Sequence, residues 1–278
     1  MSEKRYSERN RKTTVFHRDE EYIPSSFYIP MKCLQITEND KQNVTVDVII
    51  EEKSELFVNN FHVTTFFASP YELEELALGF LVCEGFIEPD TKLDPIKIEG
   101  RTMFCKIEIN TPELEELTRL ERCGTTSYRK DAIKHINPDI KFTTDAITHA
   151  VGQLKELGRI WHRTGGAHTS MICDNAGEVL FFCEDVGRAC SVDKVVGKAL
   201  MNGTDLSQCM LVTTGRLAST MVSKAVNAGI PLVASKGATV REAVELAKKA
   251  GITLVAFVRG RDMYAYAGEE RIRLNERL

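Results

Sequence analysis

The sequence has no long apolar run, no leader-like pattern in its first residues and no excess of positive charge. None of its apolar stretches approaches the roughly 18 residues that a membrane-spanning helix needs. Residues 1–22 are charged and polar, which is not the pattern of a secretory signal. The 36 lysines and arginines are outnumbered by 40 aspartates and glutamates, so a net charge of -4 offers no general attraction for nucleic acid. We therefore expect a cytoplasmic protein without membrane or nucleic-acid partners.

Metal-ligand spacings are missing as well. The 8 cysteines are scattered singly, no C-x-x-C pair occurs, and no two histidines share a predicted helix face. Structural zinc sites need such spacings, so we expect no metal. An even cysteine count can indicate disulfides in a small secreted chain. This chain of 278 residues is long enough to bury a real core, and we expect reduced thiols instead.

The composition is that of an ordinary globular protein, with 43% apolar and 27% charged residues. The length predicts about two domains. The changes in pattern along the chain suggest a flexible tail at 1–22 and a strand-rich N-terminal domain at 23–117. An exposed loop follows at 118–141, and a second domain occupies 142–278.

The N-terminal domain is predicted to contain hairpins and one helix. Asn59-Asn60 separates two alternating strands, and asparagine tolerates the positive φ of a tight turn. The helix is predicted to begin at Ser69 as N-cap, with Glu72 completing a capping box. Gly85 is a natural helix end.

From about residue 144, helices and continuous apolar strands alternate. Strands are predicted at 210–212, 230–234 and 252–258, with helices at 217–228 and 240–250. Such repeats predict an α/β fold whose parallel-rich sheet is covered by helices on both faces. Ligands of these sheets lie beyond the carboxyl ends of the strands. The turns expected there combine glycine with a basic residue: Thr213–Arg216, Ser235–Ala238 and Arg259–Asp262.

Most cysteines lie in apolar strands or on an apolar helix face, where a thiol behaves as a small hydrophobe. These are Cys83, Cys105, Cys173, Cys183 and Cys209. Cys123 differs, because it lies between Arg122 and Gly124 in a polar segment, with Arg129 and Lys130 close behind. Nearby cations raise the thiolate fraction, so Cys123 is the leading candidate for a reactive thiol. The alternative is an incidental exposed cysteine.

Three further residues have two interpretations each. Cys190 follows Arg188 near a predicted helix N-terminus, whose dipole favours a thiolate, although a buried turn residue is the alternative. Asp185 and Asp193 could each orient a basic group or cap a helix, and for Asp193 the cap is the preferred interpretation.

An ordered series of short motifs resembles the formate dehydrogenase accessory sulfurtransferase family (FdhD). The resemblance covers about residue 40 to the end. Its motifs are S-P-Y-E-L-E-E-L from Ser69, T-G-G-A-H from Thr164, E-D-V-G-R from Glu184, V-D-K-V-V-G from Val192, T-G-R from Thr214 and F-V-R-G from Phe257.

The resemblance implies a cytoplasmic sulfurtransferase. Members of the family take sulfur from a cysteine desulfurase as a persulfide and pass it to the molybdenum cofactor, which formate dehydrogenase needs in sulfurated form. The second domain is implied to have a three-layer α/β/α, cytidine-deaminase-like fold with a mixed sheet, to bind the molybdopterin guanine dinucleotide form of the cofactor, and to belong to a homodimer. Cys123 corresponds to the sulfur-carrying residue.

The cofactor-binding stretch of the family corresponds to Phe257, Val258, Arg259, Gly260, Arg261 and Asp262. Gly215 and Arg216 join this rim as predicted cofactor contacts, because glycine-rich turns with arginines suit phosphate groups. His168 could bind the cofactor, move a proton or be a structural histidine.

The sequence departs from the family pattern at several positions. The loop reads Cys123-Gly124-Thr125-Thr126-Ser127, so Thr126 occupies the place of a second cysteine. Ala189-Cys190 replaces His-Asn, and Thr220 replaces an acidic residue. The H-x-E and P-C-x-x-C motifs of zinc deaminases are absent. Besides the sulfurtransferase, two other hypotheses stay open: a non-catalytic module that binds the cofactor or a guanine nucleotide, and a nucleoside-processing enzyme.

Overall fold

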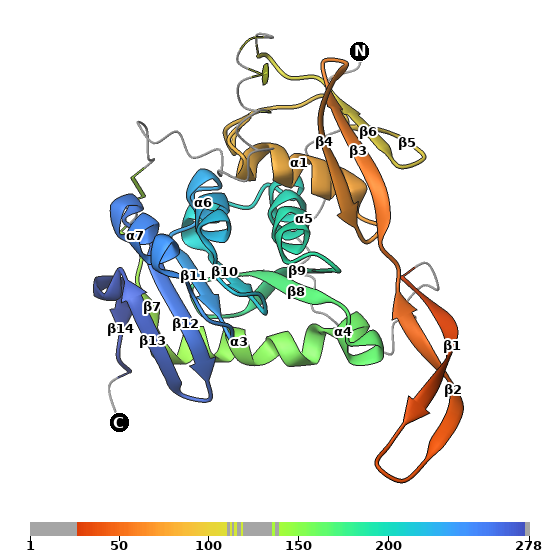
Figure 1. Ribbon diagram of the computed structural model, residues 1–278. Helices are drawn as coiled ribbons and strands as arrows, with labels where there is room; N and C mark the ends of the chain where they lie inside the picture. The colour runs from red at the N-terminus through yellow and green to blue at the C-terminus, as the bar shows by residue number, and fades with distance from the viewer. Residues whose placement is uncertain are drawn as a thin grey trace, which may run out of the picture.

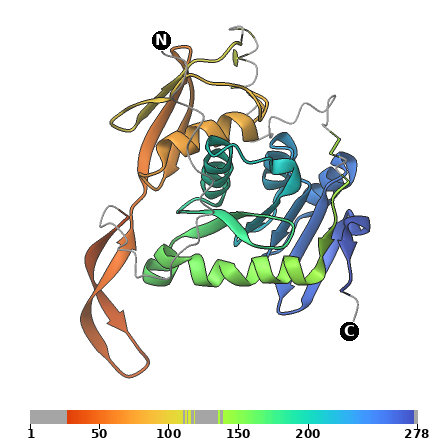
Figure 2. The same cartoon turned by 180° about the vertical axis from the view of Figure 1, so that it is seen from behind.

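The computed structural model describes residues 27–109 and 139–275, together with residues 112, 114, 115, 118, 135 and 136 (Figure 1). A small sheet with one helix packs on a larger three-layer body, and a two-stranded ribbon projects away from both (Figures 1 and 2). Within this part of the chain, no helix is long and apolar enough to cross a bilayer.

The ribbon is formed by β1 (Tyr28–Ile36) and β2 (Lys41–Ile49), which pair antiparallel only with each other. The base of the ribbon touches the short helix α4 (Arg159–Thr164). There the Arg163 side chain lies 2.7 Å from the Asp47 carboxylate and stacks over the Tyr28 ring. The sequence predicts strands in this region, but it indicates neither a separate ribbon nor α4.

The small sheet has the order β4-β3-β6-β5. Its strands are β3 (Glu52–Val58), β4 (Phe61–Ala68), β5 (Lys97–Glu99) and β6 (Thr102–Cys105). The predicted turn between β3 and β4 is confirmed, with positive φ at Asn59 and Asn60. Helix α1 (Leu73–Cys83) covers one face, where its Leu76 and Phe80 pack against Leu56.

The predicted start of α1 is wrong. The helix begins at Leu73, and Glu72 precedes it with a left-handed φ of 53° and no capping hydrogen bond from its side chain. Ser69 caps nothing, because its polar groups bind residues of the larger body. The predicted end is confirmed, since Gly85 has a positive φ just beyond the helix.

The larger body is built on a six-stranded mixed sheet of order β13-β12-β11-β10-β8-β9. Only β10, β11 and β12 run parallel to one another, because β8–β9 and β12–β13 are hairpins. The strands are β8 (His168–Cys173), β9 (Val179–Asp185), β10 (Met210–Thr213), β11 (Leu232–Ser235), β12 (Thr253–Arg259) and β13 (Asp262–Ala267).

Helices cover both faces of this sheet, which confirms the predicted α/β class and three-layer arrangement (Figure 1). One face is covered by α3 (Thr144–Leu157) and the other by α5 (Arg188–Met201), α6 (Ser219–Asn227) and α7 (Arg241–Ala250). The remaining pieces are the short parallel pair β7 (Phe142–Thr143) and β14 (Ile272–Arg273) and the turns η1 (Leu206–Gln208) and η2 (Glu269–Arg271).

The two bodies meet where α1 crosses α5 at very short range. A Cβ atom at Gly79 would collide with the main-chain carbonyl of Asp193, and one at Gly197 would collide with the carbonyl of Glu75. Glycine is therefore required on both helices, since any side chain would push the backbones apart.

We expect Gly79→Ala to lower the free energy of unfolding by about 1–3 kcal/mol, because the new methyl group overpacks the helix crossing. The matched control is Gly152→Ala in α3, where an added Cβ meets no atom within 4 Å. Alanine is the better helix former, so this control should be neutral or stabilising by up to about 1 kcal/mol. Chemical denaturation of both variants measures the difference, and equal behaviour of the two would contradict the steric argument.

Candidate functional site

Cys123, the predicted sulfur carrier, lies outside the described residues, as do its neighbours Arg122, Arg129 and Lys130. The described cysteines can be compared directly. Cys33 is the exposed one among them. Burial raises the thiol pKa at the other described positions: Cys83, Cys105, Cys173, Cys183, Cys190 and Cys209.

Cys190 does not gain the thiolate character that the helix N-terminus suggests. Burial raises its pKa to about 12, and the carboxylates of Asp185 and Asp193 add to the rise. The side chain lines a cavity of about 320 Å³ between the two bodies. Ala189 and Thr220, two further positions that depart from the family pattern, line the same cavity. Three sequence departures are thus neighbours in space.

The predicted rim does form at one edge of the large sheet. The carboxyl ends of β10, β11 and β12 meet there because the three strands are parallel. The start of β8 joins them, since it runs antiparallel to β10 with Ser170 opposite Thr213. His168 therefore lies beside the turn that carries Gly215, and its Nδ1 is 3.3 Å from Thr214 Oγ1.

The turns at this edge interlock through hydrogen bonds. Ser235 Oγ donates to the Gly215 carbonyl at 2.7 Å, and the Phe257 amide donates to the Gly237 carbonyl at 3.0 Å. Phe257 has a φ of 53°, which is strained for a residue with a Cβ. Hydrogen bonds therefore link the turn after β11 to the turn after β10 and to the end of β12.

The stretch from Phe257 to Asp262 is divided between core and surface. Val258 is buried in the core, so its side chain does not face the rim. Gly260 and Arg261 form the tight turn of the β12–β13 hairpin, in which Arg259 pairs with Asp262. The side chains of Arg259, Arg261 and Asp262 are exposed.

Positive charge gathers along the edge. Arg188 and Arg216 are exposed beside Gly215, and Lys236 follows β11. Partial burial lowers the pKa of His168, and the nearby Arg188 guanidinium lowers it further, which favours a neutral imidazole. The structure thus brings His168, Gly215 and Arg216 together, while Arg259 and Arg261 lie at the hairpin beyond them.

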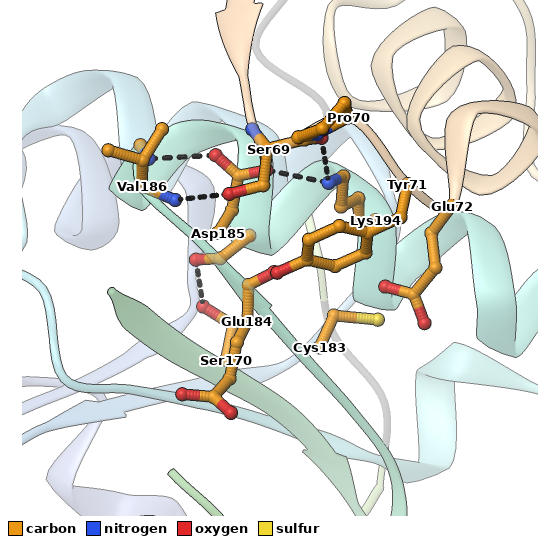
Figure 3. A network of polar contacts seen from close by, with 12 residues as sticks. Ser69, Pro70, Tyr71, Glu72, Ser170, Cys183, Glu184, Asp185, Val186 and Lys194 are labelled. Atoms are coloured by element: carbon orange, nitrogen blue, oxygen red, sulfur yellow. Dashed lines mark hydrogen bonds and ion pairs between the residues drawn. The ribbon is translucent and has the colours of Figure 1, made fainter. Parts of the chain in front are cut away.

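A buried ion pair in the larger body lies close to this edge and holds the small body through Ser69 (Figure 3). Lys194 Nζ lies 2.6 Å from Asp185 Oδ2, and neither side chain is exposed. The same Nζ donates to the Ser69 carbonyl at 2.9 Å, and the Ser69 amide donates to Asp185. Lys194 also lies 4.2 Å from the centre of the Tyr71 ring. Asp185 therefore orients a basic group, one of the two predicted roles.

A second buried cluster of charges includes Asp193, the residue before Lys194 in α5. Lys224 Nζ on α6 lies 2.6 Å from Glu84 and 2.8 Å from Asp193. Asp193 is inside α5, so its preferred role as a helix cap is wrong, and the other predicted role, orienting a basic group, is the one observed. Burial raises the pKa of Asp193 to about 6, although Lys224 opposes this rise.

The two lysines are the structural residues that the sequence argument missed. A signal was present, because Asp193 and Lys194 interrupt an apolar stripe of α5, and buried charges in such a stripe require partners. Their partners in the small body, Ser69 and Glu84, lie more than 100 positions away, which no local pattern reveals.

The chain is similar in sequence and in fold to proteins of one family. A profile described as the FdhD/NarQ family matches residues 49–273. A protein named Sulfur carrier protein FdhD from Streptomyces avermitilis is 33% identical over 82% of this chain and 89% of its own. The protein of the same name from Methanothermobacter thermautotrophicus is 29% identical over 84% of this chain and 95% of its own.

A crystal structure described as a formate dehydrogenase accessory protein from Desulfotalea psychrophila is similar with a TM-score of 0.74. It is 26% identical, and the match covers 89% of this chain and all of that one. With a family profile matching most of its length, the chain belongs to the FdhD/NarQ family.

Proposed function

We propose that this protein is a sulfur carrier that holds sulfur as a persulfide on Cys123. Its curated relatives are named as sulfur carrier proteins. The observation that supports Cys123 most is the burial of six other cysteines, because burial raises the pKa of each of these thiols. A carrier must be an accessible thiolate. Cys123, with basic neighbours in the sequence, fits that requirement better than Cys190.

The loading step is a thiol exchange. The Cys123 thiolate attacks the terminal sulfur of a persulfide on the donor, forming a new S–S bond. The S–S bond of the donor breaks, and the donor cysteine leaves as a thiolate. The proton of the persulfide stays with the transferred sulfur, and the exchange has no net oxidation or reduction. A cysteine desulfurase supplies such a donor.

The substrate that we propose for the strand edge is the molybdopterin guanine dinucleotide form of the molybdenum cofactor, destined for formate dehydrogenase. Within the described residues, no ion pair joins Arg216, Arg259 or Arg261 to an acidic side chain, so their charges are available to phosphates. A neutral His168 can accept or donate a proton beside the same turn. These features support a phosphate-bearing ligand on a protein whose net charge is negative.

The loading step is tested by incubating the full chain with a cysteine desulfurase and cysteine. Mass spectrometry of the digested protein should find one additional sulfur on the peptide that contains Cys123. A sulfur found only on another cysteine peptide contradicts the assignment.

The ligand site has its own prediction. Replacing Arg259 and Arg261 together by alanine should weaken binding of guanosine diphosphate by about tenfold or more, because charge-assisted hydrogen bonds to phosphate contribute about 1.5–3 kcal/mol. Arg241→Ala is the matched control, since this exposed arginine pairs with Glu242 and Glu245 on α7. Calorimetry gives both affinities. Unchanged binding in the double variant would exclude the hairpin as the phosphate contact.

A second function is favoured by Thr126, which stands where the family has a second cysteine. Under this alternative the protein binds and escorts the cofactor without persulfide chemistry. It predicts guanosine diphosphate binding to the full chain together with no sulfur adduct on any cysteine.

A further inference from the structure

Ser69 lies where the small body meets the strand edge of the larger one. It follows β4 directly, precedes α1, and is fully buried although its side chain is polar. Its hydroxyl accepts a hydrogen bond from the Val186 amide at 3.1 Å, as Figure 3 shows. Its amide donates to Asp185, and its carbonyl accepts from Lys194. All the polar groups of this one residue therefore bind the larger body.

The segment that Ser69 holds is the short turn between β9 and α5. Strand β9 ends at Asp185 and α5 begins at Arg188, so only Val186 and Gly187 connect them. The Val186 amide is bound by the Ser69 hydroxyl, and the Gly187 amide donates to Asp185 Oδ1 at 2.7 Å. The first residue of α5 therefore takes its position in part from two hydrogen bonds, one of which comes from the small body.

Arg188 lies over one of the turns at the strand edge. Its side chain is exposed, and its Cβ atom lies 3.0 Å from the point that a Cβ atom on Gly215 would occupy. The absence of a side chain at Gly215 therefore leaves room for the stem of Arg188 to cross the turn. Burial lowers the pKa of His168, and the Arg188 guanidinium lowers it further. The charge of Arg188 therefore acts beside Gly215 and His168, both of which are predicted cofactor contacts.

We propose that Ser69 is a positioning residue for the strand edge. Its hydroxyl holds the turn before α5 so that the Arg188 guanidinium faces a phosphate beside Gly215. The inference rests on the proposed function, from which it takes the phosphate-bearing ligand. A guanidinium binds phosphate through directed hydrogen bonds, and one that is already in place loses less conformational freedom on binding. Because linkage is reciprocal, a ligand bound at Arg188 also strengthens the contact with the small body.

A merely structural Ser69 would affect stability alone, so the test measures the strand edge itself. Ser69→Ala removes the hydroxyl and leaves the hydrogen bonds of the amide and carbonyl in place. Arg188→Ala removes the group that is positioned, and the double variant shows whether the first residue acts through the second. Ser54→Ala is the matched control. Ser54 is also a buried serine of the small body, but its hydroxyl has no hydrogen-bond partner among the described residues.

The first readout needs no ligand. NMR titration of the full chain gives the pKa of His168, whose ring signals are assigned from their absence in His168→Gln. Arg188→Ala should raise this pKa, because the imidazolium then loses a nearby cation. The other groups that face the ring, the Asp185 carboxylate and the Thr214 hydroxyl, stay in place.

Ser69→Ala should raise the pKa of His168 in the same direction but by less, since the guanidinium is displaced and not removed. The double variant should match Arg188→Ala, and Ser54→Ala should match the parent. A Ser69→Ala variant with the pKa of the parent would overturn the proposal, as would a rise that adds to that of Arg188→Ala. An Arg188→Ala variant with the pKa of the parent would overturn the placement of Arg188 at the edge.

The second readout is calorimetric binding of guanosine diphosphate to the full chain. Arg188→Ala should weaken binding about tenfold, and Ser69→Ala about threefold, because a displaced guanidinium keeps part of its interaction with phosphate. The double variant should bind as weakly as Arg188→Ala alone, and a loss equal to the product of the two separate effects would overturn the proposal. A parent protein that does not bind guanosine diphosphate would contradict the proposed ligand, while the titration of His168 still decides whether Ser69 positions Arg188.

Discussion

Cys123→Ser should reduce sulfur loading by a cysteine desulfurase to background. Serine lacks the sulfur that must form the new S–S bond, so the variant retains the shape of the residue but has no carrier. The loss should therefore be complete rather than partial. The measurement is the cyanolysable sulfur released per chain, combined with the mass of the intact protein.

Two controls separate a carrier from a merely accessible thiol. Cys33→Ser removes the exposed thiol among the described cysteines and should load normally. Cys190→Ser removes a thiol whose pKa burial raises to about 12, and it should also load normally. If Cys123→Ser still carries cyanolysable sulfur while Cys190→Ser does not, the carrier is the thiol in the junction cavity.

Lys194→Met should lower the free energy of unfolding by about 3–5 kcal/mol, because removal of one partner leaves a buried charge without compensation. Asp185 is fully buried, and in the variant it loses the ammonium group at 2.6 Å. The Ser69 carbonyl loses its donor as well. Chemical denaturation at neutral pH measures the loss.

Lys198→Met is the matched control, because it lies one turn further along the same helix. Its ammonium group pairs with Glu72, but a third of the Lys198 side chain is exposed. Water compensates a partly exposed partner, so we expect a loss of at most about 1 kcal/mol. Adding Asp185→Asn to Lys194→Met should recover part of the stability, since the unpaired charge disappears. Similar losses in the two single variants would contradict the argument that an unpaired charge costs more stability at the buried Lys194–Asp185 pair than at the partly exposed Lys198–Glu72 pair.

Local patterns in the sequence predict much of this fold. Turn residues place the hairpin at Asn59 and the helix end at Gly85, and apolar periodicity places the strands and helices of the second domain. The turn that carries Gly215 and Arg216 is also predicted correctly at the edge of the sheet, because parallel strands bring their carboxyl ends to one edge. The division of the chain into domains at 23–117 and 142–278 stays a prediction.

The sequence argument failed where distant residues decide the structure. Ser69 has every local mark of a helix cap, yet its amide, hydroxyl and carbonyl groups bind Asp185, Val186 and Lys194. Cys190 follows a favourable helix N-terminus, yet burial and two carboxylates outweigh the dipole. The ribbon was missed because alternating strands look alike whether or not a core lies beneath them.

The glycine-to-backbone crossing of α1 and α5 has a consequence for dynamics. Flexible side chains can give up their contacts one at a time. Here the contacts are between main-chain atoms, since the Asp193 and Glu75 carbonyls lie against Gly79 and Gly197, so they are lost together when the helices move apart. Separating the small sheet from the large one therefore exposes this backbone contact on both helices at the same time. In native-state hydrogen exchange, the amides of α1 and α5 should open in a single cooperative event with a shared free energy, although they belong to different hydrophobic cores.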